Sequence, residues 1–389
     1  MAFPPDACRL IVENVSSSRS TLLSLCTVSK QFQMAAEKVI YNTLSLSGYE
    51  ITSTVCTILA HAPRLAMLVV ALSISGQDSS SDDEAAEDED PAELPDDFWE
   101  SLHSALRHTT RLRFLNLHFQ GGTQTDKSWI LQNVTFQLKK FHCDLTWDDQ
   151  LAHFLSTQKR LCDLFLADFV DPPSTTPQQA SGATTSDPPR PSLPSPSHAS
   201  FLPKLSILEC TFSEAALALV PERPLTRLKT CFTHSKPDEK RVELRALLAA
   251  LRRSRRRPRA LDIADSAYTP AFALELLAAL TAGPTLCADL RYCGALVLPV
   301  DGRQRLEFYG LLMRLPQLRC VEVDVSEWEP APVHAAALRA LACELRLYCP
   351  SVTGVVFVYE FERHLVRVAE NGMVVYDEDA ATDALWRDS

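Results

Sequence analysis

The chain has 389 residues, of which 46% are hydrophobic and 22% are charged. This composition predicts a folded, soluble protein with a sizeable core, in one elongated domain or two to three globular ones, and excludes a wholly disordered chain. The net charge of −11 is local: residues 78–97 hold eleven acidic side chains and no Lys or Arg, and without them 38 acids face 38 bases. Net charge therefore predicts nothing about what the remaining surface binds.

Membrane insertion and secretion are not expected. No window of the sequence holds the roughly eighteen uninterrupted apolar residues of a membrane-spanning helix, and no basic leader precedes an apolar stretch. The twelve cysteines are scattered, with no C-x-x-C pair and no Cys/His ligand spacing. We therefore expect reduced thiols, no bound metal, and a cytoplasmic or nuclear location.

Residues 3–41 predict three short amphipathic helices. The first follows Pro4 and Pro5, and the second has Ser20 as its expected N-cap. The residues that share one apolar face are Ala7, Leu10, Ile11 and Val15 in the first helix, Leu22, Leu25, Cys26 and Ser29 in the second, and Phe32, Ala35, Ala36, Val39 and Ile40 in the third. Such a unit is too small for a robust core, so it is expected to lean on a neighbour or a partner.

A helix, a turn and a short leucine-spaced strand then recur along the chain. Strands are expected within 64–74, 111–119, 160–169, 204–212, 259–265 and 317–325, with helices within 95–110, 148–160 and 303–316 before three of them. The anchors follow L-x-x-L-x-L, as in Leu112, Leu115 and Leu117. Stacked units of this kind share one core, so the pattern predicts an α/β solenoid.

A non-repeating α/β domain with coincidental leucines is the alternative. The anchor spacing is irregular, and Gln120, Phe169 or Ser213 stands where a regular leucine-rich repeat carries asparagine or cysteine. Residues 364–379 differ from the repeats, because Asn371-Gly372 lies between two alternating apolar strands. This predicts a hairpin with a type I′ turn that caps the open edge.

Two segments are expected to be disordered insertions, 77–95 and 172–200, because one is acidic and the other is rich in proline and serine. In the acidic insertion, Ser79, Ser80 and Ser81 precede a run of acids. Two interpretations stay open: a substrate of an acidophilic kinase, or a solvated acidic run.

A basic run lies at the end of a predicted helix and consists of Arg252, Arg253, Arg255, Arg256, Arg257 and Arg259. Three interpretations stay open: a solvated helix end, a nuclear-import signal, or a site for an acidic or phosphorylated partner. Nucleic-acid binding is not expected, because aromatic residues do not interleave with the arginines.

No catalytic constellation is recognisable. The sequence has no Gly-rich phosphate loop, no G-x-S-x-G and no H-E-x-x-H, and its ten histidines are scattered. We therefore expect a protein that is not an enzyme and carries no cofactor.

The opening helices resemble an F-box of the fungal type that precedes leucine-rich-repeat-like solenoids. The match lies in Asp6, Ser29 and Lys30 together with the apolar residues Pro4 or Pro5, Ile11, Leu22, Leu25, Val28 and Phe32. Phe3 replaces the leading leucine and Asp6 the commoner glutamate. The ending, "LYCPSVTGVVFVYEF" through "DALWRD", is similar to the close of many such proteins.

The resemblance implies a substrate receptor of a Skp-cullin-F-box ubiquitin ligase, acting in ubiquitin-dependent degradation. It implies an F-box-like domain over 1–46 and a solenoid over 47–389. The F-box-like domain would bind a Skp-type adaptor, and the adaptor would connect it to a cullin-RING ligase. The residues that would contact the adaptor are Pro4, Pro5, Ile11, Leu22, Leu25, Val28 and Phe32. The solenoid would bind a protein substrate that the sequence does not identify. A scaffold without adaptor binding, a helical cap on the solenoid and an enzyme of unseen type are the alternatives.

Overall fold

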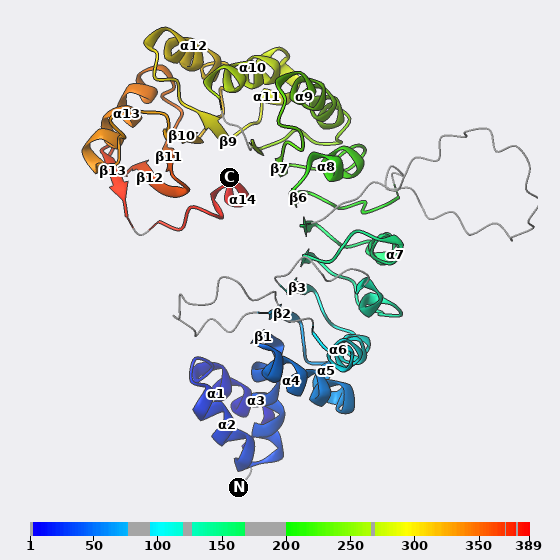
Figure 1. Ribbon diagram of the computed structural model, residues 1–389. Coiled ribbons are helices and arrows are strands. Elements are labelled where there is room, and N and C mark those ends of the chain that lie inside the picture. Colours follow the sequence, from blue (N-terminus) through cyan, green and yellow to red (C-terminus); the bar gives the residue numbers. More distant parts are fainter. Residues whose placement is uncertain are drawn as a thin grey trace, which may run out of the picture. The chain divides into compact units, whose positions relative to one another are not determined.

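A computed structural model describes residues 3–76, 94–119, 127–167, 200–265, 269–369, 371–378 and 380–389. These residues form two compact units, one holding the described residues up to 167 and the other those from 200 onward. Both units combine α-helices with a β-sheet (Figure 1), so the mixed α/β class is confirmed. Most of the predicted insertions 77–95 and 172–200 lies outside the described residues.

The first unit begins with three helices and continues with alternating strands and helices. Its helices are α1 (Pro5–Asn14), α2 (Arg19–Val28), α3 (Lys30–Asn42), α4 (Tyr49–His61), α5 (Pro63–Ala66), α6 (Asp96–His108), the 3₁₀ helix η1 (Ser128–Leu131) and α7 (Asp149–Thr157). Its strands are β1 (Thr43–Ser47), β2 (Ala71–Ser75), β3 (Phe114–His118), β4 (Lys140–Cys143) and β5 (Asp163–Leu166). The predicted helices within 95–110 and 148–160 are confirmed. The predicted domain boundary at residue 46 stays a prediction, and β1 spans it.

Side-chain caps fix where several helices begin. Ser29 accepts a hydrogen bond from the Phe32 amide at 3.3 Å, and Asp148 accepts one from the Leu151 amide at 2.7 Å. Each cap satisfies a backbone donor that has no partner within the helix. The prediction of Ser20 as an N-cap is wrong. The N-cap of α2 is Ser18, whose side chain accepts a hydrogen bond from the Thr21 amide, and the helix begins at Arg19.

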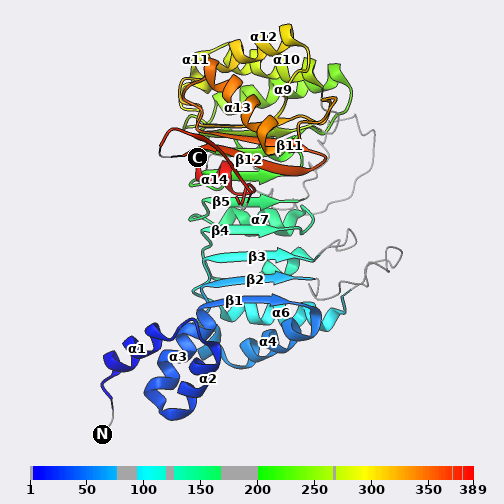
Figure 2. The same cartoon turned by 90° about the vertical axis from the view of Figure 1, so that its left-hand side faces the viewer.

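Strands β1 to β5 lie side by side in chain order, all parallel, with α4, α6 and α7 on one face (Figure 2). Each strand after β1 carries a triplet of side chains at spacing i, i+3, i+5, each at most 2% exposed, and the first of the three comes just before the strand. They are Val69, Leu72 and Ile74; Leu112, Leu115 and Leu117; Leu138, Phe141 and Cys143; and Leu161, Leu164 and Leu166. The last two of each triplet point to the same face because side chains alternate along a strand.

The second unit continues this alternation. Its strands are β6 (Ile207–Cys210), β7 (Arg227–Cys231), β8 (Ala260–Ala264), β9 (Tyr292–Val297), β10 (Cys320–Asp324), β11 (Gly354–Tyr359), β12 (Glu362–Val368) and β13 (Val374–Asp377). Its helices are α8 (Ser213–Leu219), α9 (Pro237–Arg252), α10 (Pro270–Thr281), α11 (Pro284–Cys287), α12 (Gly302–Leu312), α13 (Ala335–Tyr348) and α14 (Leu385–Asp388). The predicted helix within 303–316 is confirmed, and so are the five predicted strands from 111–119 onward, each shorter than its window. The predicted strand within 64–74 is confirmed only in its second half, because residues up to Ala66 form α5 and β2 runs from Ala71 to Ser75.

In this unit β6 to β11 are parallel and in chain order, while β12 and β13 pair antiparallel. Buried triplets recur, for example Leu318, Val321 and Val323, and they pack toward the helices. Figure 1 shows α8, α9 and α10 on one side of β6 to β9, and α14 on the other. One face of the sheet is therefore free of long helices.

The predicted C-terminal hairpin is confirmed, but its turn is different. The Gly372 amide donates to the Ala369 carbonyl and the Ala369 amide to the Met373 carbonyl, which defines a three-residue loop in which Gly372 has φ +81°. The two-residue turn lies instead between β11 and β12, where Glu360 and Phe361 both have positive φ. Positive φ at both positions is what a type I′ turn requires.

Candidate binding surfaces

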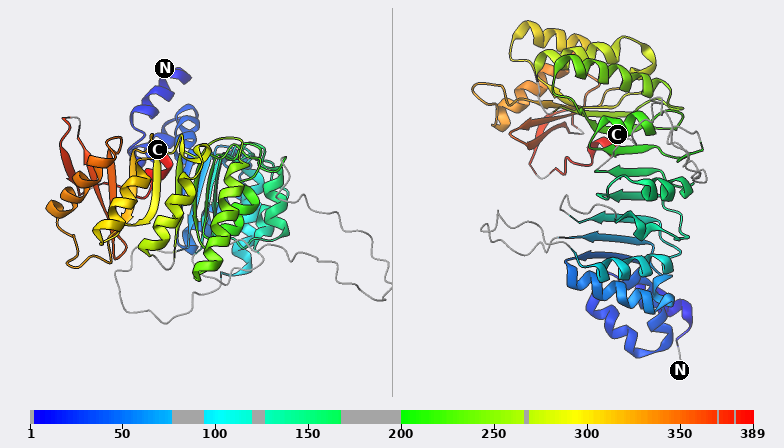
Figure 3. Two further views of the ribbon diagram at one scale, coloured as in Figure 1. Left: turned by 90° about the horizontal axis from the view of Figure 1, so that it is seen from above. Right: turned by 45° about the vertical axis from the view of Figure 1, so that its right-hand side comes forward.

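The three N-terminal helices build a small core of their own. Cys8 and Val12 of α1, Leu22 of α2, and Phe32 and Ala36 of α3 are buried together. Figure 3 shows these helices, in blue, gathered beside one another. The described side chains of this core all come from α1, α2 and α3, or flank them directly, so the cluster does not borrow core residues from the sheet.

The seven residues expected to bind an adaptor differ in how exposed they are to solvent. Pro4, Pro5, Ile11 and Val28 are exposed, and Val28 has 63% of its surface accessible. Leu25 packs partly against the helical core, while Leu22 and Phe32 lie inside it. A partner that leaves the helices packed as they are can therefore touch the first four, whereas Leu22 and Phe32 hold the helices together.

Other exposed apolar side chains lie on the same helices or directly before α1 and were not among the expected adaptor contacts. They are Phe3, Leu10, Leu23 and Met34. The predicted apolar face of the first helix is only partly buried: Val15 packs beside the buried Cys8 and Val12, whereas Leu10 and Ile11 are exposed. Cys8, Val12 and Val15 follow the i, i+4, i+7 spacing, and this phase of the helix exposes the two larger residues.

An ion pair joins this helical cluster to α5, the short helix before β2. Glu37 of α3 accepts hydrogen bonds from the guanidinium of Arg64 in α5, one of them at 3.0 Å, and from Gln33 at 2.8 Å. The hydrogen bond from Arg64 lowers the pKa of the Glu37 carboxyl. This contact orients α3 and leaves the exposed residues of α1 and α2 accessible.

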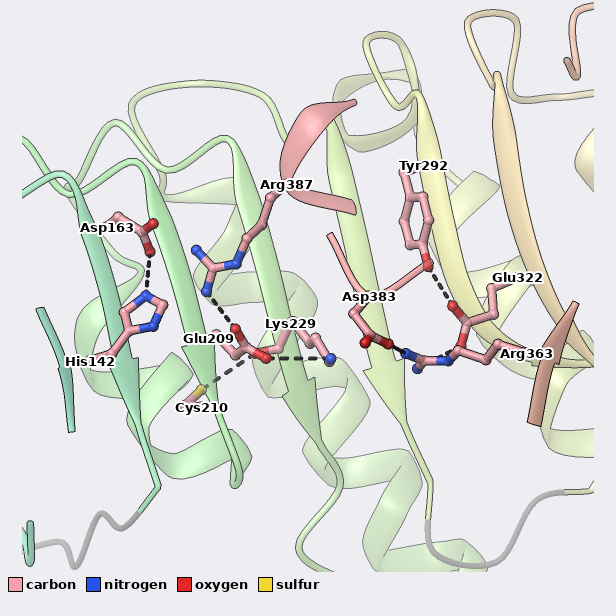
Figure 4. Close-up of polar contacts among 10 residues, drawn as sticks. All are labelled: His142, Asp163, Glu209, Cys210, Lys229, Tyr292, Glu322, Arg363, Asp383 and Arg387. Atoms are coloured by element: carbon pink, nitrogen blue, oxygen red, sulfur yellow. Dashed lines mark hydrogen bonds and ion pairs between the residues drawn. The ribbon is translucent and has the colours of Figure 1, made fainter. Parts of the chain in front are cut away.

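The open sheet face of the second unit is a charged surface. The term open sheet face means here the side of β6 to β12 that faces away from the long helices. One row across it reads Glu209, Lys229, Asp262 and Gly294 on four successive strands. Glu322 lies on the next strand, β10, where the register with β9 shifts between Val321 and Val323. Lys229 lies 3.3 Å from Glu209, and Figure 4 shows both side chains on the same face of the sheet. Alternating charges along a row favour recognition of a ligand that is itself polar.

Buried acids lie at the centre of this open sheet face. Asp262 is 3% exposed and Glu322 is 5% exposed. Burial, and next the charge of Glu322, raise the pKa of Asp262, while burial and the two acids raise the pKa of the Tyr292 phenol. The Tyr292 hydroxyl donates to Glu322 at 2.6 Å, and Arg363 donates to the same carboxylate at 3.1 Å (Figure 4).

The open sheet face of the first unit is less charged. His142 Nε2 lies 3.2 Å from an Asp163 oxygen, and the His142 ring lies 5.6 Å from that of Phe165. A hollow of about 240 Å³ beside them is lined by residues of β1 to β4, among them Ser73 and Asn116, which are hydrogen-bonded to each other. This hollow is small for a ligand pocket.

The basic run lies on the surface. All six of its arginines, from Arg252 to Arg259, are exposed, and Arg257 lies 3.9 Å from Asp289. This placement agrees with a solvated helix end and leaves the guanidinium groups accessible to an import receptor or an anionic partner. The three interpretations therefore stay open.

Among the described residues no group of His, Cys, Asp and Glu is arranged to hold a metal ion. In the same part of the chain, none of the helices combines the length and the apolar character that crossing a membrane requires. A scan of the sequence against models of protein families finds none that matches, and a search of curated proteins finds no match either.

Proposed function

We propose that this chain is the substrate-recognition subunit of a Skp-cullin-F-box ubiquitin ligase and contributes binding rather than catalysis. The observation that carries the proposal is the N-terminal helical cluster. It resembles an F-box in sequence, has its own core, and still presents Leu10, Ile11, Leu23 and Val28 to solvent. Exposed apolar anchors on a small helical unit are typical of a docking surface.

The finer fold assignment belongs to the same proposal. Parallel strands in chain order, helices on one face and buried triplets at i, i+3, i+5 support a leucine-rich-repeat-like solenoid. In such an arrangement the helix-free face is available to a protein ligand. The substrate would bind there, while the N-terminal helices contact the adaptor.

A scaffold without adaptor binding is the second candidate. The ion pair between Glu37 and Arg64 ties α3 to α5, which favours a role of α3 in closing the end of the sheet. Such a role leaves the exposed side chains of α1 and α2 unexplained.

The test uses charged substitutions at the exposed positions. Val28→Asp and Ile11→Asp change side chains that lie outside the helical core, so the melting temperature should stay near that of the wild type. Binding to a purified Skp-type adaptor should weaken at least about 30-fold, because an unpaired charge would lose its hydration in an apolar interface. Adaptor affinity is measured by calorimetry or pull-down.

Val242→Asp is the matched control. Val242 lies on α9 of the second unit and is 59% exposed, close to the 63% of Val28. This variant should bind the adaptor like the wild type. A wild-type chain that binds no Skp-type adaptor would remove the ligase role and leave the scaffold in its place.

A further inference from the structure

The segment around α14 lies on the open sheet face of the second unit. Trp386 is 2% exposed and packs with Ala260 and Tyr292 in a cluster of its own, flanked by Ile207 and Cys320. These residues come from four strands, and they face away from the buried triplets that pack against the helices. The segment is therefore not needed to close the main core.

Charged contacts surround the tryptophan. Arg387 donates to Glu209, and Arg363 donates to Asp383 at 2.9 Å (Figure 4). Arg227 donates to the backbone carbonyl of Ser389 at 2.8 Å. An aromatic anchor in an apolar recess, with an ion pair on either side, is the usual composition of a binding hot spot.

The attachment is limited and leaves room beside it. The α14 helix has a single turn, and Asp383 is 92% exposed although it is paired. A hollow of about 680 Å³ adjoins the segment, lined by Glu322, Asp324, Arg363, Thr382 and Asp383 among others. This volume falls within the range of ligand pockets, so the segment covers only part of the surface.

We propose that this surface is a peptide-binding site that residues 383–389 occupy in cis. The partner is a protein segment with an acidic residue, an aromatic residue three positions later, and an arginine directly after it. The aromatic ring would replace Trp386 over Ala260 and Tyr292, the arginine would pair with Glu209, and the acid would pair with Arg363. This proposal deepens the substrate-binding half of the proposed function and does not depend on adaptor binding.

Tethering explains why the site is closed in the free chain. A segment joined to its site by a short linker has an effective concentration of the order of 1 mM. A peptide that binds with a dissociation constant of about 100 μM is then weakened roughly tenfold by the competing segment. Removal of the segment should therefore strengthen binding in trans by about this factor.

The experiment uses the chain lacking residues 381–389 and a fluorescein-labelled peptide with the sequence of residues 380–389. Anisotropy should report binding to the shortened chain that is at least tenfold tighter than to the full chain. The peptide with Trp386→Ala should not bind. A second peptide keeps only Asp, two spacer residues, Trp and Arg in a Gly/Ser background. It should also bind the shortened chain, since it keeps the three recognised groups.

A charge exchange tests the assigned contact. The shortened chain with Glu209→Arg should lose the original peptide and gain affinity for the peptide with Arg387→Glu. In case the shortened chain fails to fold, the full-length Trp386→Ser, Arg387→Ser variant opens the same surface with the backbone intact. Circular dichroism and melting curves establish the fold of each variant.

A folded, opened variant that binds neither peptide would overturn the proposal, as would equal binding of the Trp386→Ala peptide. All measurements use the purified chain without an adaptor, so a failure to bind a Skp-type adaptor would bear only on the ligase role.

Discussion

Asp262 is a carboxyl group in surroundings that disfavour its charge. It lies on β8 between Lys229 on one neighbouring strand and Gly294 on the other, and Glu322 and Arg363 also act on it. A Cβ atom at position 294 would lie 2.9 Å from an Asp262 oxygen, so the missing side chain of Gly294 makes room for the carboxyl group. Burial dominates, and the pKa of Asp262 is raised.

This shift predicts how stability changes with pH. Above the unfolded pKa of about 4 the unfolded chain loses the Asp262 proton while the folded chain keeps it, so this residue lowers stability as the pH rises toward its folded pKa. Asp262→Asn removes the titration. At pH 8, the free energy of unfolding of the variant, measured by chemical denaturation, should exceed that of the wild type by at least about 1 kcal/mol. The difference should become smaller near pH 4.

The exposed Asp289 provides the control for this measurement. Asp289→Asn should change stability by less than about 0.5 kcal/mol at either pH, because the side chain lies at the surface. An Asp262→Asn variant that is less stable than the wild type at pH 8 would show that the buried carboxylate is compensated by its cationic neighbours.

At the scale of elements, the turns of the two C-terminal hairpins both contain a residue with positive φ, but the residue types differ. Gly372 adopts φ +81° without a side chain, whereas Phe361 adopts φ +72° with a side chain that is 98% exposed. The left-handed conformation costs an L-residue roughly 1–2 kcal/mol. The first turn is relaxed and the second is strained.

Phe361→Gly should therefore stabilise the second unit. The substitution relieves the left-handed conformation and removes no packing, since the ring lies in solvent. The greater freedom of glycine in the unfolded chain offsets part of the gain, so we expect up to about 1 kcal/mol. Thermal and urea melts measure this change, and no gain would mean that the ring contributes contacts in solution.

Gly372→Val should act in the opposite direction. Nothing lies within 4 Å of a Cβ at this position, so the cost is one of backbone conformation alone. A β-branched residue resists positive φ, and the loss should be about 1 kcal/mol or more. An unchanged melting temperature would contradict the three-residue turn.

At the scale of the whole molecule, seven of the twelve cysteines are buried. Burial raises the pKa of Cys56, Cys210 and Cys293 to about 12 each, so these thiols are protonated at neutral pH. Cys343 on α13 is exposed. Reactivity requires both the thiolate and access, so the twelve thiols should differ widely in rate.

A thiol titration of the native chain should show this difference. Ellman's reagent should modify Cys343 first, and Cys343→Ser should remove the fast phase while the slow phase remains. Denaturant should make all twelve thiols react. A fast phase of the same size in the Cys343→Ser variant would place a second reactive thiol at the surface.

The sequence alone predicted the elements that depend on local periodicity. The L-x-x-L-x-L pattern located the anchors of β3, β5 and β10, because alternation along a strand dictates which side chains meet the core. The third N-terminal helix was predicted correctly as well, since Phe32, Ala35, Ala36, Val39 and Ile40 share one stripe and pack in the helical core.

Only the tertiary structure decided which side chains remain available to partners. The phase of α1 depends on α3, which covers Cys8 and Val12 and leaves Leu10 and Ile11 exposed. The position of α14 depends on residues far away in the chain, such as Glu209, which lies 178 positions before Arg387. A one-turn helix carries no periodic signal, so its site exists only after the strands of the second unit have assembled.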